Sequence, residues 1–180
     1  MQPILKVNLT TGRTKEISVP KDWQRAYLGG ASLAARVLYE VITPDLNPLL
    51  PEAPLLFMNG PLSGTAGPAV GRFVVCGKSP ATGLWAESNC GGFWGPELRK
   101  AGYIGLWITG KAENPVYLLI NDGKLEILDA SNLWGRGTYG TTVGLRAAHG
   151  KRTRVISCGQ AGENLCRIAV LQTETGNAAG

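Results

Sequence analysis

The sequence repeats one order of expected elements, and this repeat restricts the possible folds more than any single motif does. A β-hairpin, a helix, an apolar strand, a glycine loop and a strand led by arginine occur from Ile4 to Cys76 and again from Val116 to Leu171. Within this order, Phe57–Gly60 is echoed by Ile156–Gly159. The repeat predicts an α+β fold with two similar ββαβ-type halves, about residues 1–100 and 111–180, forming mixed β-sheets with flanking helices.

Local patterns predict the elements inside each half. Asn121-Asp122-Gly123 is a strong turn signal between two strands. Asp22 is a candidate N-cap for a helix that Gly29-Gly30 interrupts and that restarts at Ser32. The last expected strand covers residues 166–172, and the small polar residues beyond it predict a loop.

A glycine-rich turn leads into a short helix near the middle of the chain. Gly91 and Gly92 have no Cβ, so backbone N–H groups there can approach a ligand closely. Gly102 is a candidate for the residue that closes the helix. Such a junction suits an anion, most often a phosphate. The alternative is a glycine-rich loop before a capped helix, with no ligand.

The composition excludes several classes of protein. With 180 residues, 44% hydrophobic and 17% charged, the chain is expected to be one globular domain. The net charge of +5 suits an anionic ligand but is too small and too evenly spread for a nucleic-acid partner. No two of the four cysteines have C-x-x-C spacing, and no apolar run is long enough for a membrane span. We therefore expect a cytoplasmic protein with free thiols.

A set of motifs spread over the whole chain points to one family. They are Val7–Gly12, Gly60–Gly64, Gly71-Arg72, Lys78–Pro80, Asn89–Tyr103, Gly110–Tyr117, Asp129–Ser131, Trp134-Gly135, Gly159 and Ala161–Asn164. Together they resemble the N-terminal domain of the tungsten-containing aldehyde:ferredoxin oxidoreductases. The resemblance implies a metallopterin-binding domain whose sheets form a base for the cofactor. That cofactor is a bis-pterin carrying tungsten or molybdenum, with a magnesium ion shared by the pterin phosphates.

The resemblance also implies which residues bind the cofactor. Arg72 corresponds to an arginine between a pterin and an iron–sulfur cluster, and Gly91 to a residue contacting a pterin phosphate. Asn89 and Ala178 correspond to residues whose backbone carbonyls hold magnesium. Asn177 stands where the family often has an arginine, so this phosphate contact departs from the family pattern. No residue of the chain is implied to be catalytic.

The activity implied by the resemblance belongs to a longer protein. The family oxidises aldehydes to carboxylic acids and passes electrons through a [4Fe–4S] cluster to ferredoxin or an iron–sulfur subunit. The cluster ligands and the substrate channel lie in helical domains outside these 180 residues, so this fragment alone is expected to be inactive. Its partners would be those domains and a small aldehyde, and self-association into a homo-oligomer is an option. The alternative is a non-catalytic scaffold or binding module that kept the fold without the cofactor.

Two aromatic residues have competing explanations. Trp94 directly follows the glycine turn and is either a core residue or a cofactor-stacking residue. His149, the only histidine, is expected to meet the carbonyl end of a helix rather than to act in catalysis.

Overall fold

The computed structural model describes residues 1–180 in full. We call residues 1–109 the N-terminal half and residues 116–180 the C-terminal half. The N-terminal half contains β1 (Ile4–Asn8), β2 (Arg13–Ile17), α1 (Lys21–Tyr27), α2 (Gly30–Leu38), β3 (Leu55–Asn59), β4 (Phe73–Lys78), β5 (Trp85–Cys90), α3 (Trp94–Lys100) and β6 (Gly105–Thr109). The C-terminal half contains β7 (Val116–Asn121), β8 (Lys124–Asp129), α4 (Gly137–His149), β9 (Ile156–Cys158), α5 (Gln160–Glu163), β10 (Leu171–Thr173) and β11 (Ala178–Ala179).

The N-terminal half forms one mixed six-stranded sheet in the order β2-β1-β6-β3-β4-β5. Strand β6 lies between β1 and β3, parallel to β1 and antiparallel to β3. Successive side chains point to opposite faces, so Ile4 and Trp107 join one core while Leu5 and Leu106 join another. The sheet is therefore buried on both faces, which explains its nearly continuous apolar strands.

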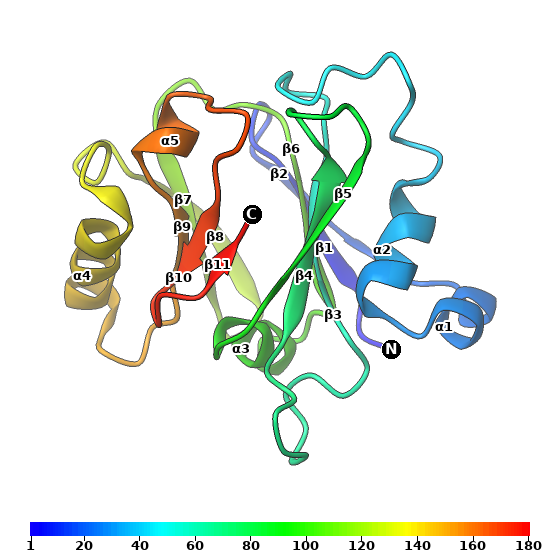
Figure 1. Ribbon diagram of the computed structural model, residues 1–180. Coiled ribbons are helices and arrows are strands. Elements are labelled where there is room, and N and C mark those ends of the chain that lie inside the picture. Colours follow the sequence, from blue (N-terminus) through cyan, green and yellow to red (C-terminus); the bar gives the residue numbers. More distant parts are fainter.

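The C-terminal half forms two small sheets, β7-β8 and β11-β10-β9. Their apolar residues pack on the second face of the six-stranded sheet, together with α3. Figure 1 shows the resulting layers in order: α1 and α2, the six-stranded sheet, the strands of the C-terminal half, and α4. The expected α+β class with mixed sheets and flanking helices is confirmed.

The two halves share part of their element order. Each begins with a hairpin, continues through helix, and then contributes three antiparallel strands, β3-β4-β5 or β9-β10-β11. The N-terminal half alone continues into α3 and β6, and the C-terminal half has the short helix α5 between β9 and β10. None of the helices has both the length and the apolar composition needed to cross a bilayer.

Three local expectations were wrong. Pro20, with φ −55°, precedes α1 and no side chain caps it, so Asp22 is not the N-cap. Of the expected strand 166–172, only Leu171 and Gln172 lie in a strand, β10 (Leu171–Thr173), because residues 166–169 form a turn in which the Ala169 backbone N–H donates to the Cys166 carbonyl at 3.0 Å. The expected terminal loop contains β11, because Ala178 and Ala179 pair with β10.

Candidate functional site: a polar junction between the halves

The end of β5 lies beside the turn between β10 and β11, which brings the two halves together. The Gly180 backbone N–H donates a hydrogen bond to Ser88 Oγ at 2.9 Å. The Cys90 thiol donates to the Asn177 carbonyl, with 3.6 Å between sulfur and oxygen. The C-terminus consequently lies in the middle of the molecule (Figure 1). We call this region the polar junction; it comprises Arg72, Asn89, Gly91, Gly92, Thr173, Thr175, Asn177 and Ala178.

Arg72 and Asn89 form the N-terminal part of the polar junction. Arg72 stands just before β4, and the β4–β5 register places Val74 opposite Asn89. This register brings the guanidinium to Asn89, where Nε donates to the side-chain oxygen and Nη2 donates to the backbone carbonyl at 3.3 Å. Both residues are exposed, so a charged fork of donors is held at the surface with N–H groups to spare.

Gly91 and Gly92 form the floor of the junction. Gly92 has φ +118°, a conformation that side chains disfavour. A Cβ on Gly92 would lie 3.3 Å from Thr175 Oγ1 and 3.8 Å from Asn177 Nδ2. A Cβ on Gly91 would lie 3.7 Å from an Arg72 nitrogen. The absence of both side chains thus leaves a small space surrounded by polar atoms from both halves.

The turn after β10 supplies the other polar atoms. Asn177 Nδ2 donates to Thr175 Oγ1 at 2.9 Å, and the Thr173 and Thr175 hydroxyls are 3.0 Å apart. The Asn177 carbonyl accepts from the Thr173 backbone N–H at 2.9 Å. Ala178 follows on the exposed side of β11, paired with Gln172. Amide and hydroxyl donors therefore converge on the glycines from the C-terminal half.

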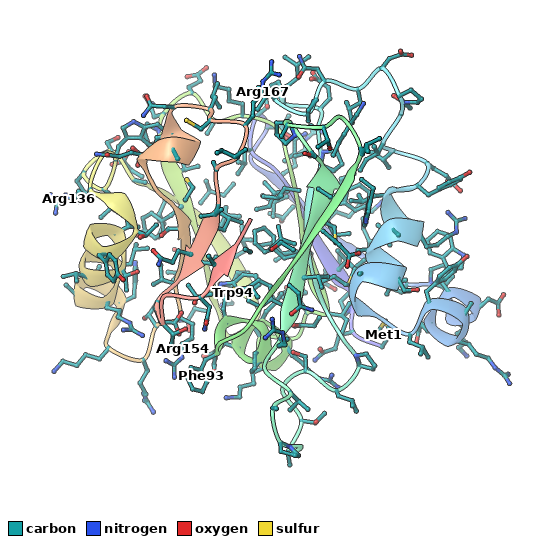
Figure 2. All side chains as sticks on the ribbon, viewed as in Figure 1. Met1, Phe93, Trp94, Arg136, Arg154 and Arg167 are labelled. Atoms are coloured by element: carbon teal, nitrogen blue, oxygen red, sulfur yellow. The ribbon has the colours of Figure 1, made fainter.

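A buried carboxylate stands between Thr173 and Thr175 in the chain. The Glu174 side chain is fully buried and pairs with Arg154, with 3.5 Å between Oε1 and Nη1. The Arg154 guanidinium also lies over the exposed Phe93 ring, 4.5 Å from its centroid (Figure 2). Burial raises the pKa of the Cys90 thiol, Arg72 opposes this rise, and Glu174 adds to it. Cys90 is thus a buried, neutral thiol at neutral pH.

Comparison with known proteins gives this arrangement a context. Residues 4–180 match the model of the family described as aldehyde ferredoxin oxidoreductase, N-terminal domain. A tungsten-containing aldehyde ferredoxin oxidoreductase of Pyrococcus abyssi is 41% identical over 178 residues, which is 98% of this chain and 29% of the relative.

The chain belongs to the aldehyde ferredoxin oxidoreductase family. It spans less than a third of the length of the relatives it matches. Another relative is a Pyrococcus furiosus protein named aliphatic sulfonate oxidoreductase, WOR-like subunit, 33% identical over 98% of this chain and 31% of its own length. Among solved structures, the active site complex BamBC of benzoyl coenzyme A reductase superposes with TM-score 0.94 at 35% identity, covering 99% of this chain and 27% of that one.

In this family domain, the structure brings together all five residues expected to bind cofactor. Arg72 and Asn89 are hydrogen-bonded, and both Arg72 and Asn177 lie beside Gly91. Ala178 follows Asn177 directly.

The sequence reasoning missed Thr173 and Thr175. No local pattern marked them, because Thr175 lies in the turn between β10 and β11, where the two-residue periodicity of a strand does not hold.

The donor set fits a phosphate together with a hard cation. Amide, hydroxyl and guanidinium groups suit phosphate oxygens, and backbone carbonyls suit magnesium. The Asn89 carbonyl, which has two lone pairs, accepts one bond from Arg72. No group of three or more His, Cys, Asp or Glu side chains gathers anywhere in the structure. Residues of the polar junction could therefore hold the phosphate end of a cofactor, with magnesium bound through carbonyl oxygens.

Trp94 and His149 lie outside the polar junction. The Trp94 ring packs against Phe57 and Phe73, with centroids 5.2 and 5.0 Å away, so it is a core residue and not a stacking platform. His149 ends α4, and its Nε2 lies 2.9 Å from the Tyr117 hydroxyl, with no carboxylate bonded to it. Both side chains line a cavity of about 790 Å³, which none of the five expected cofactor residues touches.

Proposed function

We propose that this chain is the metallopterin-binding domain of a longer oxidoreductase. The whole enzyme would oxidise aldehydes to carboxylic acids at a tungsten or molybdenum bis-pterin centre. It would pass the electrons through a [4Fe–4S] cluster, whose ligands lie outside this chain, to ferredoxin or an iron–sulfur subunit. This chain alone would be inactive, and we propose a cytoplasmic location.

One observation carries the proposal: donors from both halves meet at the polar junction beside two glycines. Arg72 and Asn89 come from the β4–β5 side, and Asn177 from the β10–β11 side. A ligand that carries two phosphates would suit this site, because each half contributes hydrogen-bond donors that could bind one phosphate. The tungsten in the names of the relatives supports the identity of the metal.

The residues of this chain would bind and orient the cofactor rather than react. The planar guanidinium of Arg72 would donate to pterin heteroatoms with the N–H groups that Asn89 leaves free. Thr175 and Asn177 would donate to a phosphate, and the carbonyls of Asn89 and Ala178 would hold the magnesium ion. When bound, the metal centre would supply the two-electron oxidation of an aldehyde and water to an acid, two protons and two electrons.

The aldehyde is a proposal drawn from the relatives' names. Proteins about 40% identical are named for aldehyde oxidation, whereas one at 33% identity is named for aliphatic sulfonates. No residue of the polar junction selects among such substrates, because the junction offers only phosphate- and pterin-type contacts.

A non-catalytic scaffold is the second candidate, and one residue favours it. Asn177 offers a neutral amide where a family member often carries arginine, and this amide already donates to Thr175. A charged hydrogen bond contributes about 1.5–3 kcal/mol and a neutral one about 1 kcal/mol, so the exchange weakens one phosphate contact. Arg72 remains, which is why we place the cofactor-binding function first.

Metal and pterin analysis of the longest native product of the gene, purified without air, tests the proposal. Growth medium containing both tungstate and molybdate removes metal supply as a variable. About two pterins per tungsten or molybdenum, with iron, is the expected result. A folded product without metal and pterin would overturn the proposal and favour the scaffold.

A further inference from the structure

Buried polar side chains are rare in this protein, and they gather at the polar junction. Of the 31 buried residues, only Asn59, Ser63 and Thr173 carry a charged group, an amide or an aliphatic hydroxyl. Thr173 belongs to the polar junction itself. Asn59 ends β3, and Ser63 lies in the loop that leads from β3 to Arg72. Burial of a polar group costs free energy unless the group is hydrogen-bonded, so the contacts of Asn59 and Ser63 should explain their position.

The Asn59 side chain ties the end of β3 to the first turn of α3. Its Nδ2 donates to the Gly95 carbonyl at 2.9 Å, and its Oδ1 accepts from Ser63 Oγ at 3.1 Å. Because a carbonyl can only accept, Gly95 sets which end of the amide faces α3. The contact is close, since a Cβ on Gly95 would lie 2.7 Å from Asn59 Oδ1. Asn59 therefore fixes the helix that begins two residues after Gly92.

Ser63 connects this amide to Arg72. Its Oγ lies 3.1 Å from the Arg72 carbonyl and 3.1 Å from Asn59 Oδ1, and both of these atoms are acceptors. A hydroxyl has one proton, so Ser63 shares it between them in a three-centre hydrogen bond. The Arg72 backbone is thus held from the interior, while its guanidinium reaches Asn89 at the surface.

The backbone before Arg72 packs directly on the glycine floor of the junction. A Cβ on Gly71 would lie 2.6 Å from the Gly92 carbonyl, which is closer than side chains come to a backbone oxygen. The loop also lies beside α3 (Figure 1), where Arg99 Nη1 donates to the Pro61 carbonyl at 2.6 Å. Any movement of the Arg72 backbone therefore presses on Gly92 or opens a gap beside it.

We propose that Ser63 and Asn59 are positioning residues for cofactor binding, which hold the Arg72 backbone against the glycine floor so that the guanidinium meets the cofactor. Both side chains are buried, so they act through Arg72 and touch no cofactor themselves. The proposal rests on the cofactor-binding function proposed above for the polar junction.

Pterin release from four proteins tests the proposal. They are the longest native product of the gene, purified without air, and its Ser63→Ala, Arg72→Ala and doubly substituted forms. Ser63→Ala should speed pterin release about fivefold, the effect of losing one neutral hydrogen bond. In the Arg72→Ala background, the same substitution should change the release rate less than about twofold, because no guanidinium is left to position. Free pterin is measured at a temperature at which thermal unfolding shows all four proteins to be folded.

Two further variants separate positioning from packing. Ser63→Cys nearly keeps the size of the side chain but has only a weak donor, so it should also release pterin faster than the native protein. This variant takes the place of Ser63→Ala if the alanine form does not fold. Thr65→Ala removes an exposed hydroxyl of the same loop, which donates to the Leu62 carbonyl at 2.8 Å, and should leave the release rate unchanged.

Four results would overturn the proposal. Release from Ser63→Ala could match release from the native protein, or Ser63→Cys alone could do so, which would mean that Ser63 only fills space. An equal effect of Ser63→Ala with and without Arg72, or an equal effect of Thr65→Ala, would mean that the loop acts on stability in general. Failure of the cofactor-binding function itself is distinguished from these results, because the native protein would then contain no pterin to release.

Discussion

Strands β3 and β7 have similar apolar sequences but lie in different surroundings. Four of the five residues of β3, Leu55–Asn59, are buried. None of the six residues of β7, Val116–Asn121, is buried. Strand β3 has neighbours on both edges and a packed layer on both faces, whereas β7 has one neighbour and borders a cavity. Apolar composition therefore sets which residues can be buried, and the number of neighbouring strands sets how completely they are.

The largest contrast should be in stability. Leu56→Ala in β3 removes a fully buried side chain and should lower the free energy of unfolding by about 2–5 kcal/mol. Leu119→Ala in β7 removes a half-buried side chain beside an existing cavity and should cost about 1 kcal/mol or less. Urea unfolding with unchanged m-values measures both. Equal losses would show that the two strands are packed alike.

A second contrast lies in two thiols. Burial, and then Glu87, raises the pKa of Cys76 on β4 to about 12, so Cys76 should resist iodoacetamide at pH 8. Cys158 on β9 is exposed and should be labelled, but more slowly than Cys166, because burial of the sulfur and then Glu163 raise its pKa. Mass spectrometry of labelled peptides gives the order, and rapid labelling of Cys76 would contradict it.

The same pKa shift predicts a pH dependence of stability. The folded state keeps the Cys76 proton more tightly than the unfolded state does, so the neutral thiol stabilises the fold below pH 9.0. This contribution to the free energy of unfolding should be lost as pH rises from 9.0 towards about 12. Because Cys76→Ala removes the thiol, the free energy of unfolding of this variant should fall less over the same pH range.

The smallest effect concerns a single bond between the halves. The Tyr103 hydroxyl donates to the Gly123 carbonyl, in the turn between β7 and β8, at 2.7 Å. Tyr103→Phe should lower the free energy of unfolding by about 1 kcal/mol. Tyr139→Phe, on a side chain that is 77% exposed, is the matched control and should change it by less than about 0.5 kcal/mol. An equal effect of both substitutions would mean that this bond does not support the C-terminal half.

The sequence predicted the longer elements because their signals are local. Alternating apolar residues locate β1, a short continuous apolar run locates β3, and the Asn121-Asp122-Gly123 turn locates the β7–β8 hairpin. The short strands β10 and β11 could not be located, because two or three residues carry no pattern and their pairing depends on the turn at Gly176. The cavity that β7 borders was also beyond local patterns, because it depends on the order of strands in the sheets.

Apart from the glycine turn at Gly91-Gly92, the residues of the polar junction were predicted only through family resemblance. Arg72 and Asn89 are far apart in sequence, and the β4–β5 register alone brings them together. The spacing from Asn89 to Asn177 carries no signal at all, since these residues meet through the packing of the two halves. Thr173 and Thr175 were missed because threonines at a strand end are common.

Cofactor content of two arginine variants tests the central claim, that the polar junction binds the metallopterin. In the longest native product of the gene, Arg72→Ala removes the guanidinium at the junction, and Arg136→Ala removes one from an exposed position beside α4, far from the junction (Figure 2). We predict that Arg72→Ala lowers pterin and tungsten or molybdenum per folded protein at least about tenfold, since a charged hydrogen bond contributes roughly 1.5–3 kcal/mol. Arg136→Ala should retain both, and unchanged thermal unfolding of the two variants confirms that the fold is intact. Full pterin and metal content in folded Arg72→Ala would contradict the claim.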